Sequence, residues 1–506
     1  MKKTLLLALF ALPIAVRAAE DITWSCGFTN ETEIATYVQA KSIGNAILSS
    51  GSAASGITCS IDTGSGQSPK ANEKYLKIVP GTTAGGYYAT IALPEWKPCE
   101  NWSFSFDYAP SRGGNNNNNC DYGIAVHDTY GRALFSCKGH QESYVSSFTV
   151  YKGCDGEQSL FSTNSVGDFS ESYDSNTTNR WMRFVLTGSS TGTTLSIITN
   201  LANNAALDLS SSSLGSSFAV PAKILVRTGN QASRLQWACV DDISFTGTAK
   251  AFNKIADYDF EEDDDQSILT NGFVTSTLLG TTAITNDTVN WTVAEGSTGA
   301  KLNEKFARLA AAGDTSTHGM LVSFPFDIVK EQDKATTYEL SFDAVVEADS
   351  NTGGVNGMVV VGSNGTHLAT LKSTTSTATL YNSSGTAIAD SIQVSSRGTT
   401  SDPATNDIKW HRFIFKRDDA GAMKLTMVSL ATGETIIEDV TIENEAISQI
   451  AFVAKTSNKD RYGYAAIDNI KVWTYRKGGF TIIIADGDEE ADKVVESDAL
   501  KTWCRG

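Results

Sequence analysis

Oxygen-bearing side chains stand at two pairs of positions that could hold a cation. In the first half of the chain, Asn30-Glu31 follows the first short apolar run and Asp241-Asp242 lies within the last one. In the second half, Glu261–Asp265 and Asp468-Asn469 hold the same places. Ca²⁺ takes about six to eight oxygen ligands, which carboxylates supply well. In a β-sandwich whose first and last strands are neighbours, these groups would meet. We therefore predict structural Ca²⁺ in each repeat, with Glu31 and Asp241 as ligands in the first and Glu262 and Asp468 in the second.

The alternative is a set of solvated acidic turns, with Asp side chains bonded to backbone amides. The acidic segment from Asp486 to Asp492 resembles a calcium loop only loosely, because it lacks Gly at the sixth position and Glu at the twelfth.

Nucleophilic hydrolysis is suggested by one motif and opposed by its context. Residues 188–192 read Gly-Ser-Ser-Thr-Gly and satisfy Gly-x-Ser-x-Gly. That chemistry needs a sharp strand-to-helix turn, whereas this segment lies between two alternating apolar runs. We predict a hairpin turn at this position.

The sequence offers no convincing residues for acid–base catalysis or for a catalytic metal ion. The five histidines do not form a His-Glu-x-x-His motif, and we interpret His127 as a strand residue. Sandwich-fold glycosidases use two carboxylates that flank one bond, but Asp107 and Asp343 are lone carboxylates at equivalent positions. We expect them to cap strand ends or turns, and we assign no catalytic residue.

The elements that carry these residues occur twice. A basic residue, a tryptophan and an alternating apolar run stand at residues 180–186 and again at 409–415, each followed by a turn and a second alternating run. This pattern predicts a β-hairpin. Further matches keep the same order: 24–28 with 255–260, 102–107 with 338–343, 123–134 with 357–368, and 238–244 with 465–471.

The repeat predicts an all-β protein with two tandem jelly-roll β-sandwich domains, at residues 19–248 and 252–475. Alternating strands have one buried face, so two sheets must pack together in each unit. Trp102, Trp181 and Trp410 fall within strands, and we expect them in the core. The acidic tail at 476–506 leaves the repeat pattern, and a linker, a docking segment for a surface protein and an edge strand all stay open.

Residues 1–18 have the pattern of a secretory signal peptide, with Lys2 and Lys3 before an apolar run and a cleavage site near Ala18. No later apolar run is long enough to span a bilayer, so we expect a secreted or cell-surface protein with no integral membrane segment. The net charge of −17 becomes about −20 without the signal, which argues against binding to nucleic acid.

The chain has eight cysteines, seven of them in the first repeat and none spaced as Cys-x-x-Cys. Export makes disulfides the expected state. Because seven is odd, one of these cysteines is free or pairs with Cys504 or with another chain.

A Phe-Glu entry, a Trp-x-Arg-Phe hairpin and a closing Ile-Asp-Asn-Ile-Lys-Val resemble the concanavalin A-like lectin/laminin-G superfamily and jelly-roll carbohydrate-binding modules. The resemblance covers both repeats. It implies sugar binding on a concave sheet face or at loop tips, often with a structural calcium ion, and it carries over no particular sugar-contacting residue.

We therefore expect a secreted, non-catalytic protein that binds a polysaccharide or glycoprotein glycan, within a bacterial polysaccharide-utilisation or surface system. One alternative is an extracellular adhesion or structural protein. The other is a glycoside hydrolase or lyase on the same fold.

Overall fold

The computed structural model describes most of the chain, and the predicted signal segment lies outside the described part. The described residues are 21–39, 57–64, 70–81, 85–110, 120–142, 145–154, 158–163, 181–189, 192–201, 205–209, 214, 220–231, 234–250, 252–280, 291–296, 301, 304–312, 317–347, 355–373, 377–394, 409–418, 420–455, 462–475, 482–485 and 492–495.

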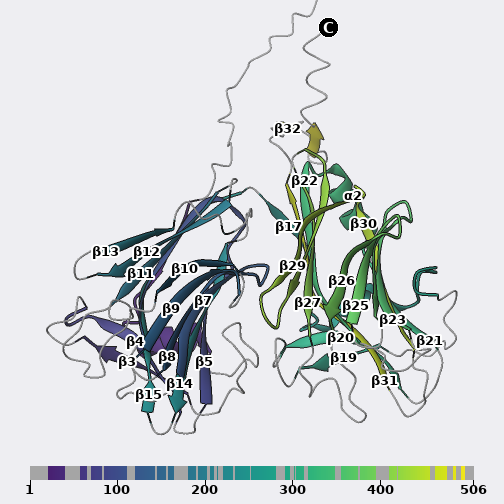
Figure 1. Ribbon diagram of the computed structural model, residues 1–506. Helices are drawn as coiled ribbons and strands as arrows, with labels where there is room; N and C mark the ends of the chain where they lie inside the picture. Colours follow the sequence, from purple (N-terminus) through teal and green to yellow (C-terminus); the bar gives the residue numbers. More distant parts are fainter. Residues whose placement is uncertain are drawn as a thin grey trace, which may run out of the picture.

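Two antiparallel sheets, each of eight strands, form from residues 21–249 (Figure 1). Sheet 1 has the order β13-β12-β11-β6-β16-β4-β3, with β1 also paired to β16. Sheet 2 has the order β10-β9-β8-β7-β14-β5-β2, with β15 paired to β14. The strands of sheet 1 are β1 (Asp21–Cys26), β3 (Thr58–Thr63), β4 (Lys74–Val79), β6 (Cys99–Pro110), β11 (Met182–Ser189), β12 (Gly192–Asn200), β13 (Ala205–Leu209) and β16 (Ala238–Ala249). Those of sheet 2 are β2 (Val38–Gln39), β5 (Gly85–Ala92), β7 (Cys120–Asp128), β8 (Ala133–Glu142), β9 (Val145–Lys152), β10 (Ser159–Thr163), β14 (Pro221–Gln231) and β15 (Arg234–Gln236).

Two further antiparallel sheets form from residues 253–475 and lie beside the first pair (Figure 1). Sheet 3 has the order β19-β20-β31-β22-β27-β28-β29, with β17 paired to β31, and sheet 4 has the order β18-β21-β30-β23-β24-β25-β26. The strands of sheet 3 are β17 (Asn253–Tyr258), β19 (Trp291–Glu295), β20 (Lys305–Ala312), β22 (Thr337–Val346), β27 (His411–Arg417), β28 (Met423–Ser429), β29 (Thr435–Ile442) and β31 (Tyr462–Tyr475). Those of sheet 4 are β18 (Leu269–Asn271), β21 (Thr317–Ser323), β23 (Val355–Gly362), β24 (His367–Ser373), β25 (Thr377–Asn382), β26 (Ala387–Gln393) and β30 (Ile447–Lys455). We call residues 21–249 the first sandwich and residues 253–475 the second sandwich.

Alternation along the strands builds one core between the sheets of each sandwich. In β11, Met182, Phe184 and Leu186 are buried, while the residues between them point outward. Phe184 stacks on Phe135 of sheet 2, with ring centroids 5.4 Å apart, so the two sheets share these side chains. The all-β sandwich prediction is confirmed.

The repeated hairpins and the closing strands lie where the sequence predicted them. β11 pairs with β12, and β27 pairs with β28, each antiparallel. The first strand pairs with the last strand in both sandwiches, β1 with β16 and β17 with β31. The predicted core tryptophans, Trp102, Trp181 and Trp410, are all buried.

In the described part of the chain, three short helical segments follow or connect these strands: α1 (Glu31–Tyr37), the 3-10 helix η2 (Asp263–Ile268) and α2 (Phe326–Lys334). Asn30 caps α1 in a capping box with Glu33, which explains why the acidic Asn30-Glu31 segment directly follows β1. No helix in the described part of the chain is long and apolar enough to cross a membrane.

The disulfide expectation is not met by the cysteines whose side chains the structure describes. Cys26, Cys59, Cys99, Cys137, Cys154 and Cys239 form no disulfide bond in the described structure. The side chains of Cys120 and Cys504 lie outside the described residues. In the tail, β32 (Ile482–Ala485) pairs with β33 (Asp492–Val495) as a separate hairpin, so the described tail strands are not edge strands of either sandwich.

Candidate functional site

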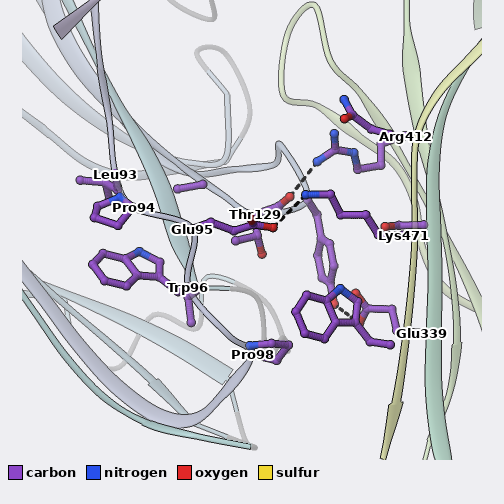
Figure 2. A pocket seen from close by; sticks show the side chains of 15 residues that line it. Leu93, Pro94, Glu95, Trp96, Pro98, Thr129, Glu339, Arg412 and Lys471 are labelled. Carbon is purple, nitrogen blue, oxygen red and sulfur yellow. Dashed lines mark hydrogen bonds and ion pairs between the residues drawn. The ribbon is translucent and has the colours of Figure 1, made fainter. Parts of the chain in front are cut away.

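A cleft of about 350 Å³ lies between the two sandwiches (Figure 2). The first sandwich supplies the segment between β5 and β6, the turn between β7 and β8 and the start of β14. The second sandwich supplies the outer face of sheet 3. In Figure 2, Leu93, Pro94, Trp96 and Pro98 stand on one side, and the sheet 3 side chains stand on the other. The sheet 3 wall consists of Glu339, Ser341, Arg412, Asn469, Lys471 and Trp473.

Strand alternation explains why the sheet 3 wall is polar. In β22, Phe342 and its alternating neighbours point into the core, so Glu339 and Ser341 point outward. The register of β22 and β31 places Glu339 opposite Trp473 and Ser341 opposite Lys471. These cross-strand neighbours form one continuous patch on the outer face of the second sandwich.

Arg412 joins the two walls. Its Nε lies 2.6 Å from Oδ1 of Asp343, its Nη2 lies 2.8 Å from Oδ2, and its Nη1 donates to the Thr129 carbonyl of the first sandwich at 2.7 Å. Burial works to lower the pKa of Arg412, but the Asp343 charge outweighs it and raises the pKa further. Arg412 is therefore a permanently charged group whose charge is matched by one carboxylate.

Two more contacts cross the cleft. The Tyr130 hydroxyl donates to Glu339, and the Lys471 ammonium pairs with Glu95 at 2.8 Å. Burial raises the pKa of Glu339 and, together with the Glu339 charge, raises the pKa of Tyr130 well above its ordinary value. Tyr130 therefore stays protonated and acts as a hydrogen-bond donor.

The two indoles in the cleft differ in how they are held. Trp96 is buried, donates to the Pro221 carbonyl at 2.9 Å and stacks on Phe245 with centroids 4.4 Å apart. Trp473 is only partly buried, and the Lys254 ammonium lies 5.7 Å from its ring centroid. Trp473 is therefore the indole with surface left for a ligand.

The turn between β7 and β8 docks against the hairpin between β28 and β29. The Ala133 amide donates to the Gly433 carbonyl at 3.0 Å, and Arg132 pairs with Glu438 at 3.0 Å. Gly433 has φ of +78°, and a Cβ there would lie 2.8 Å from the His127 ring. Only glycine fits so close an approach, so the docked hairpins hold the cleft in a defined shape.

On the outer face of sheet 1, a buried lysine lies among carboxylates. The Lys70 ammonium is 2.7 Å from Asp107 and 2.9 Å from Asp241, and it also contacts Asp242. Asp107 is at the same time bound by Arg183, with Nε at 2.6 Å and Nη2 at 2.8 Å.

The second sandwich repeats the arrangement on the outer face of sheet 3, the face that also forms the cleft wall. The Lys301 ammonium is 2.7 Å from Asp343 and 2.6 Å from Asp468. Arg412 binds Asp343 as Arg183 binds Asp107, and Asn469 stands where the first sandwich has Asp242 and donates to Asp343 at 3.0 Å. The lysine cluster therefore fixes the carboxylate that orients Arg412 in the cleft.

The two aspartates that contact Lys301 have pKa values shifted in opposite directions. Burial works to raise the pKa of Asp343, but Arg412 and Lys301 outweigh it and hold the pKa well below its usual range. Asp468 has no arginine partner among the described residues, and burial raises its pKa to about 7 despite Lys301. Burial likewise raises the pKa of Asp241 to about 6.

Two of the four predicted calcium ligands, Glu31 and Glu262, are exposed residues at helix starts. Glu31 is the first residue of α1, and Glu262 precedes η2, whose first turn is wholly acidic. Acidic side chains at these positions are favoured by the helix dipole without any metal ion.

The other two predicted ligands, Asp241 and Asp468, contact lysine ammonium groups. Within the described ranges, the acidic or thiol side chains close enough to share a metal ion are Glu73, Asp241 and Asp242, and Lys70 lies against all three. The residues do not fit a Ca²⁺ ion there unless the ammonium is displaced. Calcium at the four predicted residues stays a prediction.

Other sequence-based expectations are settled by these contacts. Asp107 and Asp343 are not caps of strand ends or turns; each is a fully buried ion-pair centre, because an arginine from the neighbouring strand and a loop lysine both reach it. His127 is a buried residue of β7, as predicted. Gly188 lies in β11 and Gly192 begins β12, so the Gly-x-Ser-x-Gly motif spans a hairpin, as predicted.

The lysine clusters had a sequence signal that repeat matching could have found. Residues 70–75 read Lys-Ala-Asn-Glu-Lys-Tyr, and residues 301–306 read Lys-Leu-Asn-Glu-Lys-Phe. The cleft had no such signal, because its walls come from strands and turns that are distant in the sequence.

No known family model matches the chain, and no curated protein is similar to it. Similar solved structures include a cellulose-induced protein, Cip1, at 13% identity and a TM-score of 0.28, covering 45% of this chain and 98% of that one. The tandem CBM22 domains of Paenibacillus barcinonensis Xyn10C match at 12% identity and a TM-score of 0.20, covering 90% of this chain and 98% of that one. An alginate lyase from a Corynebacterium species matches at 9% identity and a TM-score of 0.21, covering 33% and 76%. TM-scores this low do not carry a function from those proteins to this chain.

Proposed function

We propose that the protein binds a neutral glycan in the cleft between its sandwiches and does not alter it chemically. The observation that carries the proposal is the make-up of the cleft, in which Trp473 offers an aromatic surface beside polar groups from both walls. Sugars have apolar faces that pack on aromatic rings and hydroxyl groups that pair with convergent polar side chains.

The pairing of charges favours a neutral ligand over an ionic one. Arg412 is matched by Asp343, and Lys471 is matched by Glu95. A charged ligand would have to break one of these pairs, whereas a hydroxyl group can add a hydrogen bond to a paired side chain. The docked hairpins support binding further, because a preformed cleft lowers the entropy lost when a ligand is held.

The test is a glycan array probed with the exported chain, followed by titration calorimetry on the glycans that bind. Trp473→Ala is expected to weaken binding roughly 30-fold, as truncation of a central tryptophan commonly does. Trp237→Ala is the matched control, because Trp237 is also partly buried beside a lysine, Lys77 at 5.2 Å, but does not line the cleft. Wild-type affinity in Trp473→Ala would contradict the site, and a protein that binds no glycan would favour an adhesion or structural role.

Two carboxylates in the cleft favour hydrolysis as a second candidate function. The hydrogen bond and charge of Lys471 lower the pKa of Glu95, while burial raises the pKa of Glu339. An acid and a base with separated pKa values are what glycoside hydrolysis requires. Glu339, however, already accepts the Tyr130 hydroxyl. Release of reducing sugar from a bound glycan, abolished in Glu339→Gln, would establish this second function.

Export to the medium or the cell surface is part of the proposal and rests on the pattern of residues 1–18. Fractionation of the source cells tests it, with the mature chain expected to begin near residue 19. Retention of the full chain inside the cell would contradict it. Binding of a surface protein through the tail would be tested by comparing the chain with and without residues 476–506 in the same fractions.

A further inference from the structure

Each sandwich contains a lysine whose ammonium is almost wholly enclosed. The Lys70 and Lys301 side chains are 4% and 3% exposed. The indole of Trp181 lies 5.7 Å from the Lys70 ammonium, and the indole of Trp410 lies 5.5 Å from that of Lys301. A lysine is rarely buried this deeply unless fixed negative groups surround it.

The negative groups come from several parts of each sandwich. Lys70 contacts Asp107 of β6 and Asp241 and Asp242 of β16, and Glu73 lies 3.5 Å away. In the second sandwich, the same places are held by Asp343, Asp468 and Glu304, at 2.7, 2.6 and 3.2 Å from Lys301. Oxygens converging from separate strands onto one cation are the arrangement that a structural metal ion normally makes.

In each sandwich, a glycine lies close against the backbone of the buried lysine. The Gly64 amide donates to the Glu73 carbonyl at 2.9 Å, and the Gly296 amide donates to the Glu304 carbonyl at 2.9 Å. A Cβ on Gly64 would lie 1.8 Å from the Lys70 carbonyl oxygen, and one on Gly296 would lie 1.9 Å from that of Lys301. The same close approach of a glycine to the lysine backbone in both sandwiches indicates that each unit is built to place the ammonium at this position.

We propose that Lys70 and Lys301 are the structural cations of the two sandwiches, so that folding of the chain is independent of Ca²⁺, and that removing the Lys70 ammonium uncovers a latent divalent-cation site. The ammonium is a compact charge able to serve three oxygens. Without it, Asp241 or Asp468 would lie buried beside a second aspartate, and only the arginine bound to that second aspartate would remain to balance the two charges, which strongly destabilises a fold.

The first measurement is thermal unfolding of the wild-type chain after EDTA treatment and again in about 10 mM CaCl₂. This concentration is about a hundred times the dissociation constant of a weak calcium site. Sodium chloride at matched ionic strength is the control for screening. We expect a midpoint that shifts by less than about 1 °C between these conditions, since nothing remains for the ion to compensate. Direct binding is measured on the same sample by equilibrium dialysis with radioactive calcium.

The second measurement uses two variants at one position. Lys70→Ala is expected to lower the midpoint by roughly 10 °C and to recover about half of that loss with calcium. Lys70→Met is expected to lose similar stability without recovery, because the methionine side chain still fills the space that an ion would need. Lys301→Ala and Lys301→Met provide a comparison pair in which we expect a loss of stability with little or no recovery in calcium. Asn469 replaces the carboxylate of Asp242 there, and the carboxylates around Lys301 are not among the described groups close enough to share a metal ion.

Each outcome decides the proposal. A wild-type midpoint that rises with calcium would overturn it and direct attention to Oδ1 of Asp241, which is buried with no hydrogen-bond donor among the described residues. Equal stability of Lys70→Ala and wild type, or a loss in Lys70→Ala that calcium does not reverse, would also overturn it. If the alanine variants do not fold even with calcium, the wild-type titration and dialysis still decide whether the native chain takes up the ion.

Discussion

Arg412 and Arg183 allow the contribution of the contact between the sandwiches to be measured separately. Both arginines bind a fully buried aspartate through two hydrogen bonds, but only Arg412 also donates to a carbonyl of the other sandwich, Thr129. Replacing each arginine by alanine removes an arginine–aspartate pair in both sandwiches. Arg183→Ala also removes a 3.3 Å contact with the half-exposed Asp242, and Arg412→Ala also removes the contact with the other sandwich.

The exposure and contacts of each arginine set the expected loss of unfolding free energy. Removing Arg412, whose side chain is 20% exposed, leaves Asp343 with Lys301 and costs about 3 kcal/mol, at the lower end for a broken buried pair. Loss of the charged hydrogen bond to Thr129 adds about 1.5–3 kcal/mol. Arg183 is 36% exposed, so solvent screening reduces the cost of Arg183→Ala to about 1–2 kcal/mol.

The assay is differential scanning calorimetry of the two variants and wild type at one pH and salt concentration. Because a kilocalorie per mole corresponds to about 2–4 °C in a unit of this size, the Arg412→Ala transition should lie roughly 15 °C below wild type and the Arg183→Ala transition roughly 4 °C below. A loss in Arg183→Ala equal to or larger than that in Arg412→Ala would refute the reasoning, since it would leave no stabilisation for the contact between the sandwiches.

Three further variants test other parts of the structure. Tyr130→Phe leaves Glu339 without its donor; we expect a midpoint lower by about 3–6 °C in calorimetry and weaker glycan binding, and an unchanged protein would contradict the cross-cleft bond. Gly433→Ala forces a side chain against His127, so proteolysis at residues 430–433 should accelerate severalfold, while Gly421→Ala, at positive φ with open space around it, should leave the cleavage rate at those residues unchanged. Asp468→Asn tests the pKa of about 7 in the folded state. Because this pKa is raised above the unfolded value, wild type loses stability as pH rises from about 4 to 7, by up to roughly 1.4 kcal/mol per unit, and the variant lacks this loss. The midpoint of Asp468→Asn relative to wild type should therefore rise between pH 4 and pH 8, and a constant difference would contradict the shifted pKa.

The strands could be predicted because their signal is local. Residues 180–186 alternate between core and surface within one strand, and that alternation requires no knowledge of the partner strand. The repeat added the order of the strands, and the neighbouring first and last strands followed from the sandwich architecture.

The role of the acidic residues could not be predicted, because a cation site and the first turn of a helix both favour acidic residues after a strand. Acidic residues after a strand suit a cation site, but they equally suit the first turn of a helix, and Glu31 and Glu262 lie at helix starts. Asp241 and Asp468 do converge on a cation, but that cation is a lysine from a loop more than a hundred residues away in the sequence.

The cleft could not be predicted because no local pattern distinguishes its residues. Trp473 looks like any outward-facing strand residue, and only docking of the two sandwiches brings Thr129 and Tyr130 near it. In the first sandwich, the positions equivalent to Glu339 and Trp473 are Ser103 and Thr246, which also face each other across two paired strands. The core and the buried lysine clusters are repeated in both copies, whereas these outward-facing positions differ between them.

The position of the cleft sets how many ligands one chain can hold. A tandem of two sandwiches with a site on each would be bivalent, and a chain of that kind gains avidity on a polymer and can cross-link two strands of it. Here both sandwiches contribute walls to the same cleft, so that cleft forms once per chain. Glycan binding in this cleft, as proposed above, would therefore hold one polysaccharide segment per cleft and would not by itself agglutinate particles coated with the polysaccharide. The second sandwich contributes a wall to that cleft, where a tandem module would contribute a second site.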